Sequence, residues 1–121
     1  MDGYAYPKVS GKPYKFAKIK FGGPWILPSM AEKAILVKKQ QNDIVRELVD
    51  GFNDIIAGLS HKYTYFHHID IRNEFPEDDD WHNEIHLNKK AYKRLAGIYS
   101  TRMMEILKYD PKTKHTHVLM A

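Results

Sequence analysis

The strongest constraint on the fold is the uneven distribution of proline and glycine along the chain. Residues 1–28 are punctuated by Pro7, Gly11, Pro13, Gly22, Gly23, Pro24 and Pro28. Proline removes a backbone donor and glycine costs conformational entropy, so this density excludes a long helix. We therefore predict an irregular arm over residues 1–28, with at most one short strand, over residues 14–21.

The composition changes at Ser29, where a long helix is expected to begin. Ser29 and Glu32 have the spacing of a capping box, in which each side chain satisfies a free backbone N–H of the other. Behind them, apolar residues recur at steps of four, four, three and four: Ile44, Leu48, Phe52, Ile55 and Leu59. This spacing predicts one apolar stripe on a helix that reaches about Leu59.

Residues 63–71, which read YTYFHHIDI, are predicted to form a strand. The segment is rich in aromatic and β-branched residues and too short for an ordinary helix. Phe66, Ile69 and Ile71 give it apolar character on both faces, as expected for a strand inside a helix-covered parallel sheet.

A second helix is expected after a polar loop over residues 73–85. Asn88 is placed to cap it, and Leu87 and Tyr92 are placed to pack together across its first turn. We expect the helix to end at Asp110-Pro111 and the last ten residues to form a polar tail or a short strand. The predicted buried face comprises Leu95, Ile98, Tyr99, Met103, Ile106 and Leu107.

Together these elements predict an α/β fold, specifically part of a three-layer arrangement with two long helices and one to three strands. A chain of 121 residues suits one such domain. We expect the irregular arm, residues 1–28, to precede a single α/β segment, residues 29–121.

Composition removes several classes of function. The chain has no cysteine, which excludes disulfides and thiolate metal sites. No apolar run approaches the roughly 18 residues of a membrane span, and no signal-peptide core follows Met1, so we expect no membrane partner. The compartment is unknown, with the cytoplasm as the default expectation.

The net charge of +4 lies entirely in residues 1–20, which hold five lysines and one aspartate. A basic arm can bind nucleic acid. Here, however, the lysines are scattered among Tyr, Pro and Gly without arginine or repeat, and a solvated arm explains the same pattern. We therefore expect no nucleic-acid partner.

Residues 78–96, DDDWHNEIHLNKKAYKRLA, concentrate candidate chemistry. His82 and His86 lie four apart, a spacing that brings two imidazoles onto one metal only within a helix. The helical zinc-protease pattern needs Glu directly after the first histidine, where this chain has Asn83. The segment also precedes the predicted cap at Asn88, so we expect neither a metal site nor a cofactor. A histidine on a solvated loop is the plainest alternative.

The same stretch resembles the last sequence block of the SGNH (GDSL-like) lipase and esterase family. That block has the pattern Asp-x-x-His, usually followed by a Gly-Tyr pair on the next helix. His86 falls on the catalytic histidine, and Ala91-Tyr92 falls on the Gly-Tyr pair. The order Trp81, Asn83, Glu84, Ile85, His86 fits one branch of the family, and the likeness extends more loosely over residues 40–107.

The resemblance implies that His86 is the general base of a hydrolase and that Asn83 takes the position of the triad acid. It also implies the fold of the C-terminal portion of an SGNH or flavodoxin-like domain. An amide can hold the imidazole's tautomer but cannot stabilise imidazolium by charge. Glu84 or Asp80 could replace the missing acid, and the sequence leaves both open.

The family's nucleophile is absent from this chain. None of the four serines lies in a Gly-Asp-Ser motif, and Gly51-Phe52-Asn53-Asp54 imitates the oxyanion block only in the middle of a predicted helix. We therefore expect a fragment that is inactive alone. Its expected partner is a second copy or the missing N-terminal portion, with an ester as substrate only once it is completed. The alternative is a non-enzymatic α/β interaction module that oligomerises.

Overall fold

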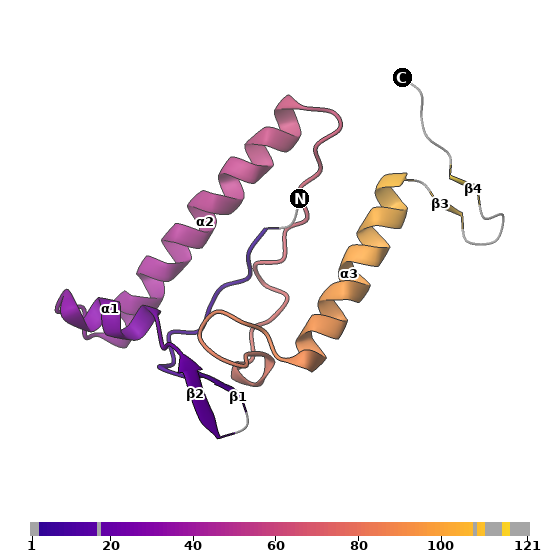
Figure 1. The fold of residues 1–121 in the computed structure, drawn as a ribbon. Helices are drawn as coiled ribbons and strands as arrows, with labels where there is room; N and C mark the ends of the chain where they lie inside the picture. The colour runs from indigo at the N-terminus through magenta and orange to yellow at the C-terminus, as the bar shows by residue number, and fades with distance from the viewer. Residues whose placement is uncertain (1–2, 17, 108, 111–114, 117–121) are drawn as a thin grey trace.

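Three helices make up most of the regular structure in this computed structural model, which describes residues 3–16, 18–107, 109–110 and 115–116. They are α1 (Ile26–Glu32), α2 (Lys38–Lys62) and α3 (Lys89–Leu107), and a 3-10 turn spans Asp78–Asp80. The two long helices flank a group of extended segments and loops (Figure 1).

The predicted three-layer α/β fold is wrong. Within the described ranges, the named strands form two separate antiparallel pairs and no parallel sheet. The first pair joins β1 (Tyr14–Phe16) to β2 (Ile19–Gly22), where a single strand was expected. The second pair joins β3 (Tyr109–Asp110) to β4 (His115–Thr116).

The predicted strand over residues 63–71 is also absent. This segment leaves the end of α2 through a turn and runs extended toward Ile71. Two backbone hydrogen bonds join it and the residues after it to the N-terminal segment, from Gly3 N to Ile69 O (2.9 Å) and from Tyr6 N to Arg72 O (3.4 Å). Composition favoured a strand, but a strand needs a continuous ladder of such bonds.

The single helix predicted from Ser29 is divided in two. Ala34 adopts a left-handed backbone conformation (φ 57°), its N–H donates to Ala31 O (2.9 Å), and the N–H of Ile35 donates to Met30 O (2.9 Å). This pair of bonds is the Schellman motif that ends helices. Ser29 is no cap, because it lies inside α1 and its hydroxyl donates to Trp25 O (2.8 Å).

The predicted buried face of α2 is wrong, because most residues of the predicted apolar stripe are exposed. The buried residues of α2 are Gln41, Val45, Val49, Asn53 and Ile56. Leu48, Phe52, Ile55 and Leu59 are instead exposed, and only Ile44 of the predicted stripe packs against a core cluster. The helix therefore has apolar side chains on two adjoining faces, of which one is covered.

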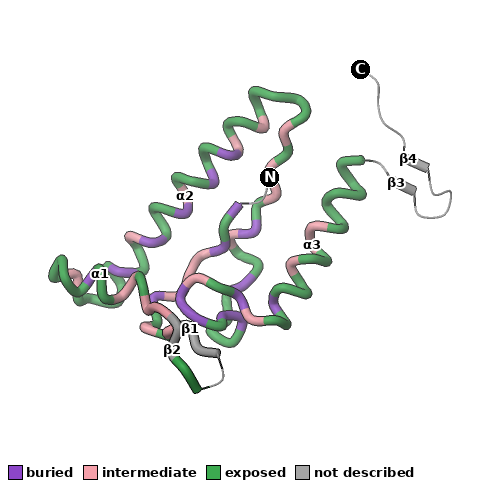
Figure 2. Tube along the Cα trace, in the orientation of Figure 1, coloured by how far each residue is buried: buried purple, intermediate pink, exposed green. Residues whose placement is uncertain are grey.

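The core consists of two clusters on either side of the extended segment 3–9, which runs between α2 and the loop before α3 (Figures 1 and 2). The segment contributes the buried side chain of Ala5 to the first cluster and that of Val9 to the second. The first cluster also contains Ile71, Phe75, Trp81, Leu87 and Ala91, and the second contains Met30, Val45 and Val49.

Arg72 joins this core to α2 by ion pairs. Its guanidinium bonds the carboxylates of Asp70 (2.6 Å) and Asp50 (2.8 Å). The Tyr6 hydroxyl, which also donates to Asp50 (2.6 Å), together with Arg72 holds the pKa of Asp50 below its usual value. Hydrogen bonds from Arg72 likewise lower the pKa of Asp70.

The predicted start of α3 is confirmed. Asn88 Oδ1 accepts the backbone N–H of Ala91 (2.9 Å), which is the bond expected of an N-cap. The predicted buried face is only partly right, since Leu95, Ile98 and Tyr99 pack against the first cluster, whereas Met103, Ile106 and Leu107 are exposed. The helix ends at Leu107, and Pro111 lies outside the described residues.

Among the described helices, none combines the length and the apolar composition that crossing a lipid bilayer requires.

Candidate functional site

The candidate site is the loop over residues 80–88, which closes on itself before α3. Trp81 and Leu87 form an antiparallel bridge across it. One step further in, the N–H of His82 donates to the carbonyl of His86 (2.8 Å). The tip between these two histidines therefore has a fixed conformation although it contains no regular secondary structure.

Both ends of the loop are anchored to α3. The N–H of Asn88 donates to Asp80 O (2.8 Å), while the side chain of Asn88 caps the helix. Asp80 is buried, and its carboxylate pairs with Arg94 on α3 at 2.6 Å. The helix and the loop are thus held together by a shared cap and by an ion pair between the buried Asp80 and the exposed Arg94.

Asn83 is fully buried at the tip, and its side-chain oxygen orients His86. Oδ1 accepts the backbone N–H groups of Ile85 (3.1 Å) and His86 (2.9 Å) and lies 3.0 Å from His86 Nδ1. The two backbone donors require an oxygen at this position, which settles the orientation of the amide. His86 Nδ1 must then be the donor, which leaves Nε2 as the basic nitrogen of the neutral ring.

The other end of the Asn83 amide has no hydrogen-bond partner among the described residues. Nδ2 is buried there, a situation that costs about 1–3 kcal/mol relative to a satisfied group. Asn83 is therefore held in place through its oxygen alone, in spite of this cost.

Glu84 is fully buried and turns away from His86. Its carboxylate accepts four backbone N–H groups, those of Trp25 (2.6 Å), Ile26 (2.8 Å), Gly11 (3.0 Å) and Leu27 (3.1 Å). Three of these donors are Trp25, the residue before α1, and Ile26 and Leu27, the first two residues of α1, where N–H groups have no partners within the helix. Glu84 thus joins the loop to α1 and to the N-terminal segment.

Neither proposed replacement for the triad acid is in position. The two oxygens of Glu84 are engaged by α1 and Gly11, and the two oxygens of Asp80 face Arg94 at 2.6 and 3.4 Å. The residue that the structure places on the Nδ1 side of His86 is Asn83. The oriented imidazole therefore has an amide partner in the position where the family has a carboxylate.

His86 is exposed at the molecular surface. Trp25 approaches the ring edge-on, with centroids 6.0 Å apart and planes at 71°. Beneath the loop, the Tyr4 hydroxyl donates to the carbonyl of Ile85, and burial raises the pKa of Tyr4.

The serines do not complete a triad. The hydroxyls of Ser29 and Ser60 donate to carbonyls within their own helices, and the hydroxyl of Ser10 accepts the N–H of Lys12. Ser100 lies exposed on α3, after the loop and its cap. No group of three or more metal-binding side chains occurs in the part of the chain that the structure describes.

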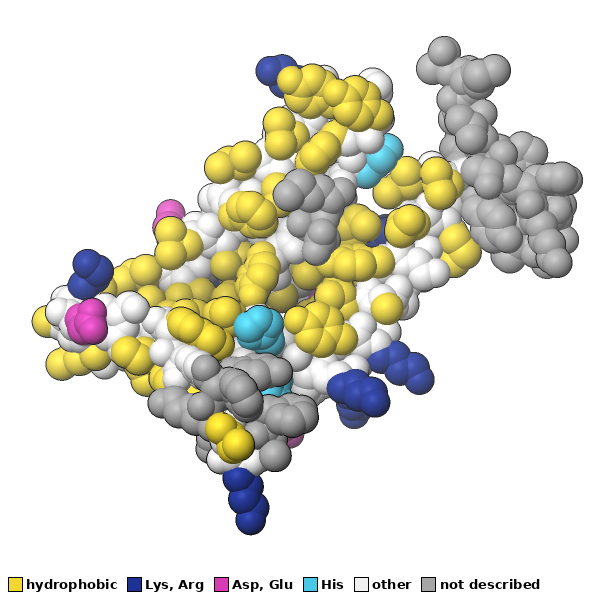
Figure 3. Space-filling model, viewed as in Figure 1, with side chains coloured by type: hydrophobic (Ala, Val, Ile, Leu, Met, Phe, Trp, Pro, Cys, Tyr) yellow, Lys and Arg dark blue, Asp and Glu magenta, His cyan; other side chains and the backbone are white. Residues whose placement is uncertain are grey.

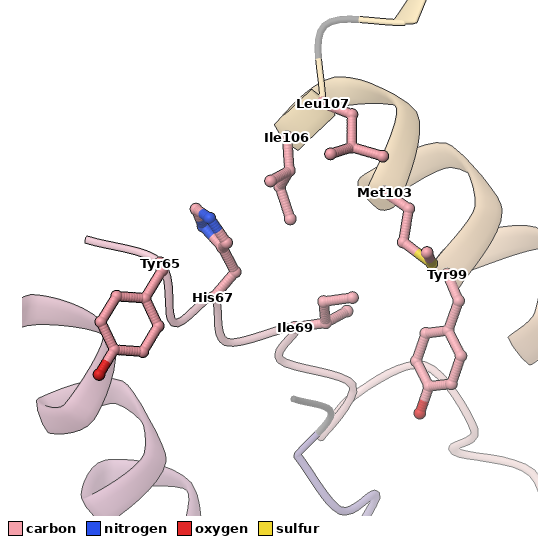
Figure 4. Close-up of a pocket in the computed structure, with 7 residues that line it drawn as sticks. All are labelled: Tyr65, His67, Ile69, Tyr99, Met103, Ile106 and Leu107. Atoms are coloured by element: carbon pink, nitrogen blue, oxygen red, sulfur yellow. The ribbon is translucent and has the colours of Figure 1, made fainter. Parts of the chain in front are cut away.

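An apolar pocket lies elsewhere in the described part of the chain. It has a volume of about 380 Å³ and lies between residues 65–69 and the second half of α3 (Figure 4). Its lining consists of Tyr65, His67, Ile69, Tyr99, Met103, Ile106 and Leu107, none of which belongs to the loop 80–88.

Sequence reasoning found the loop and the pairing of Asn83 with His86, but it missed what Glu84 does. The pattern Trp-x-Asn-Glu-Ile-His marked Glu84 as part of a motif without indicating that its partners lie near residues 11 and 25–27. Comparison of the chain with protein-family models, with characterised proteins and with solved structures gave no match. Any function must therefore be argued from the geometry of this loop.

Proposed function

We propose that this chain is the C-terminal portion of an SGNH-type ester hydrolase, with His86 as the general base and Asn83 as the residue that orients it. By itself the chain is inactive. The serine nucleophile and the oxyanion donors belong to an N-terminal portion outside this chain, and an ester is the substrate only of the completed protein.

The observation that supports this proposal is the contact between Asn83 Oδ1 and His86 Nδ1 at 3.0 Å. A buried side chain that fixes the tautomer of an exposed imidazole is the arrangement that a general base requires. An unconstrained surface histidine has no need of a buried, half-satisfied asparagine behind it.

The chemistry open to the isolated chain is limited. His86 could accept a proton from water through Nε2 as the water attacks an ester carbonyl. Without donors for the oxyanion that develops, the reaction would lack a stabilisation of roughly 3–4 kcal/mol. Without a serine nucleophile in the site no acyl-enzyme forms, so neither a product burst nor saturation with ester is expected.

Hydrolysis of p-nitrophenyl acetate tests the inactivity of the chain alone. The rate should rise linearly with ester concentration and should match that of an equal concentration of free histidine side chains. His86→Ala and the matched control His82→Ala, in the same loop, should change it equally little. A product burst with saturation, abolished by His86→Ala but retained in His82→Ala, would contradict the proposal.

The DNA upstream of the Met1 codon tests the fragment assignment separately. An in-frame Gly-Asp-Ser motif is the expected result. A stop codon directly upstream, with no such motif in a neighbouring reading frame, would count against a missing N-terminal portion.

A non-enzymatic interaction module is the second candidate, and a separate observation favours it. The outer face of α2 exposes several large apolar side chains, and proteins rarely leave such a face uncovered. This function does not depend on His86.

A further inference from the structure

The outer face of α2, defined here as Leu48, Phe52, Ile55 and Leu59, is unusually apolar for a helix surface. These side chains are 69, 44, 68 and 36% exposed. Figure 3 shows hydrophobic side chains along the length of α2 on the side that faces the viewer. A large side chain exposes roughly 200 Å² when fully accessible, so the face presents about 400 Å² of apolar surface. That area lies in the range of the largest apolar patch on a typical monomer, a patch that is often functional.

The charged side chains in the middle of α2 lie on the other side of the helix from this face. At about 100° per residue, the charged side chains between residues 43 and 54 fall within an arc of roughly 100°. The outer face lies on the opposite side of the helix axis, and no charged residue interrupts it between Leu48 and Leu59. The charged residues in question are Asp43, Arg46, Glu47, Asp50 and Asp54.

Two glycines border the outer face on its open side. Gly51 and Gly58 lie seven residues apart on the same side of α2, and a Cβ added at either would meet nothing within 4 Å. Each glycine in a helix costs about 1 kcal/mol relative to alanine. Space is therefore available there for the close approach of another backbone, at a cost in helix stability that the chain alone does not recover.

We propose that the outer face of α2 is a self-association surface on which a second copy of this chain packs its own α2 in the antiparallel direction. The spacing of the face, with steps of four, three and four residues, is that of a two-helix seam. Because the spacing reads the same in both directions, a twofold axis between Phe52 and Ile55 places each apolar residue opposite another.

A second copy in this arrangement places apolar residues opposite apolar residues and brings no charges into opposition. With the axis at that point, Leu48 faces Leu59 of the second copy, Phe52 faces its Ile55, and no charged side chain opposes another over residues 48–59. The contact of about 400 Å² per copy lies below the roughly 800 Å² of a standard interface. A dimer that dissociates at micromolar concentration is therefore expected. The proposal is independent of any role of His86.

Sedimentation velocity over a range of concentrations tests the association. The wild-type chain should move from a monomer to a plateau at the dimer mass. Ile55→Lys should raise the dissociation constant at least 100-fold, because it places two charges at the axis. Leu36→Lys, which changes a residue that is 71% exposed outside the face, should leave it unchanged. A monomer throughout, open-ended aggregation, or a dimer that survives Ile55→Lys would overturn the proposal.

Single cysteines test the antiparallel direction, since the chain has none of its own. At 1.5 Å rise per residue, two copies of Ile55→Cys lie about 4–5 Å apart along the axis and two copies of Leu59→Cys about 16 Å apart. Disulfides form only at short separations, so Ile55→Cys should cross-link with itself and Leu59→Cys should not. Equal cross-linking of both variants would indicate parallel helices. Cross-linking of neither would contradict a contact between the α2 helices of two copies.

Discussion

The loop 80–88 and the outer face of α2 invert the usual distribution of polar and apolar groups. In the loop, Asp80, Asn83 and Glu84 are buried, and each is held by hydrogen bonds or an ion pair. On α2, large apolar side chains are exposed on a long and regular helix. The contrast separates a region whose partners lie within the chain from a face that the described residues leave uncovered.

The difference shows how a polar segment can be held in place by hydrogen bonds within the chain while an apolar helix face stays uncovered. Buried polar groups are stable only when their hydrogen bonds are satisfied, so the loop is tied to α1, α3 and the N-terminal segment. An apolar face needs only contact with another apolar surface. A second copy can provide that contact without any change in the loop.

The largest expected effect comes from Glu84. Glu84→Ala leaves four backbone N–H groups without their carboxylate and should lower the free energy of unfolding by about 3–5 kcal/mol. Glu84→Gln keeps the volume but turns an NH₂ group toward donors, and should cost about 2 kcal/mol. Denaturant unfolding followed by circular dichroism measures both.

Glu77→Ala is the control for this measurement. Glu77 is exposed and only its backbone carbonyl bonds its neighbours, so the change should stay within about 0.5 kcal/mol. If Glu84→Ala were as mild as Glu77→Ala, the loop would not depend on its buried carboxylate and the comparison would fail.

Two adjacent residues of α2 test the comparison on the side of the apolar face. Ile56 is buried and Ile55 is exposed, although both are isoleucines in the middle of α2. Ile56→Ala should cost about 2–4 kcal/mol of unfolding free energy through the cavity that it creates. Ile55→Ala should cost less than about 0.5 kcal/mol, measured by denaturant unfolding at a concentration at which the chain is monomeric. Equal losses would mean that the outer face is covered within a single chain.

The sequence predicted the features that depend on neighbouring residues. The cap at Asn88 needs only a side chain three residues before its backbone donor, and the pairing of Asn83 with His86 likewise spans three residues. The cap follows from local spacing, whereas the pairing was expected from the resemblance of this segment to the SGNH block. The end of α1 at Ala34 is also a local feature, but the sequence did not predict it. A left-handed helix end at a residue other than glycine or asparagine leaves no compositional signal.

Features that depend on distant partners were not predictable. The apolar periodicity of α2 fits two adjoining stripes, one through Val45 and Val49 and one through Leu48 and Ile55, and spacing alone does not say which is covered. Residues 63–71 have the composition of a strand but no ladder partner. The four donors of Glu84 lie 57 or more positions away in sequence.

Measurement of the tautomer of His86 by ¹⁵N nuclear magnetic resonance tests most directly whether the loop holds a histidine ready to act as a base. His86→Gln assigns the resonances, and the other histidines serve as references within the same sample. The neutral ring should carry its proton on Nδ1 in the wild-type chain and should lose that preference in Asn83→Ala, since Asn83 Oδ1 is the acceptor. A proton on Nε2 in the wild type, or a tautomer unchanged by Asn83→Ala, would contradict this account.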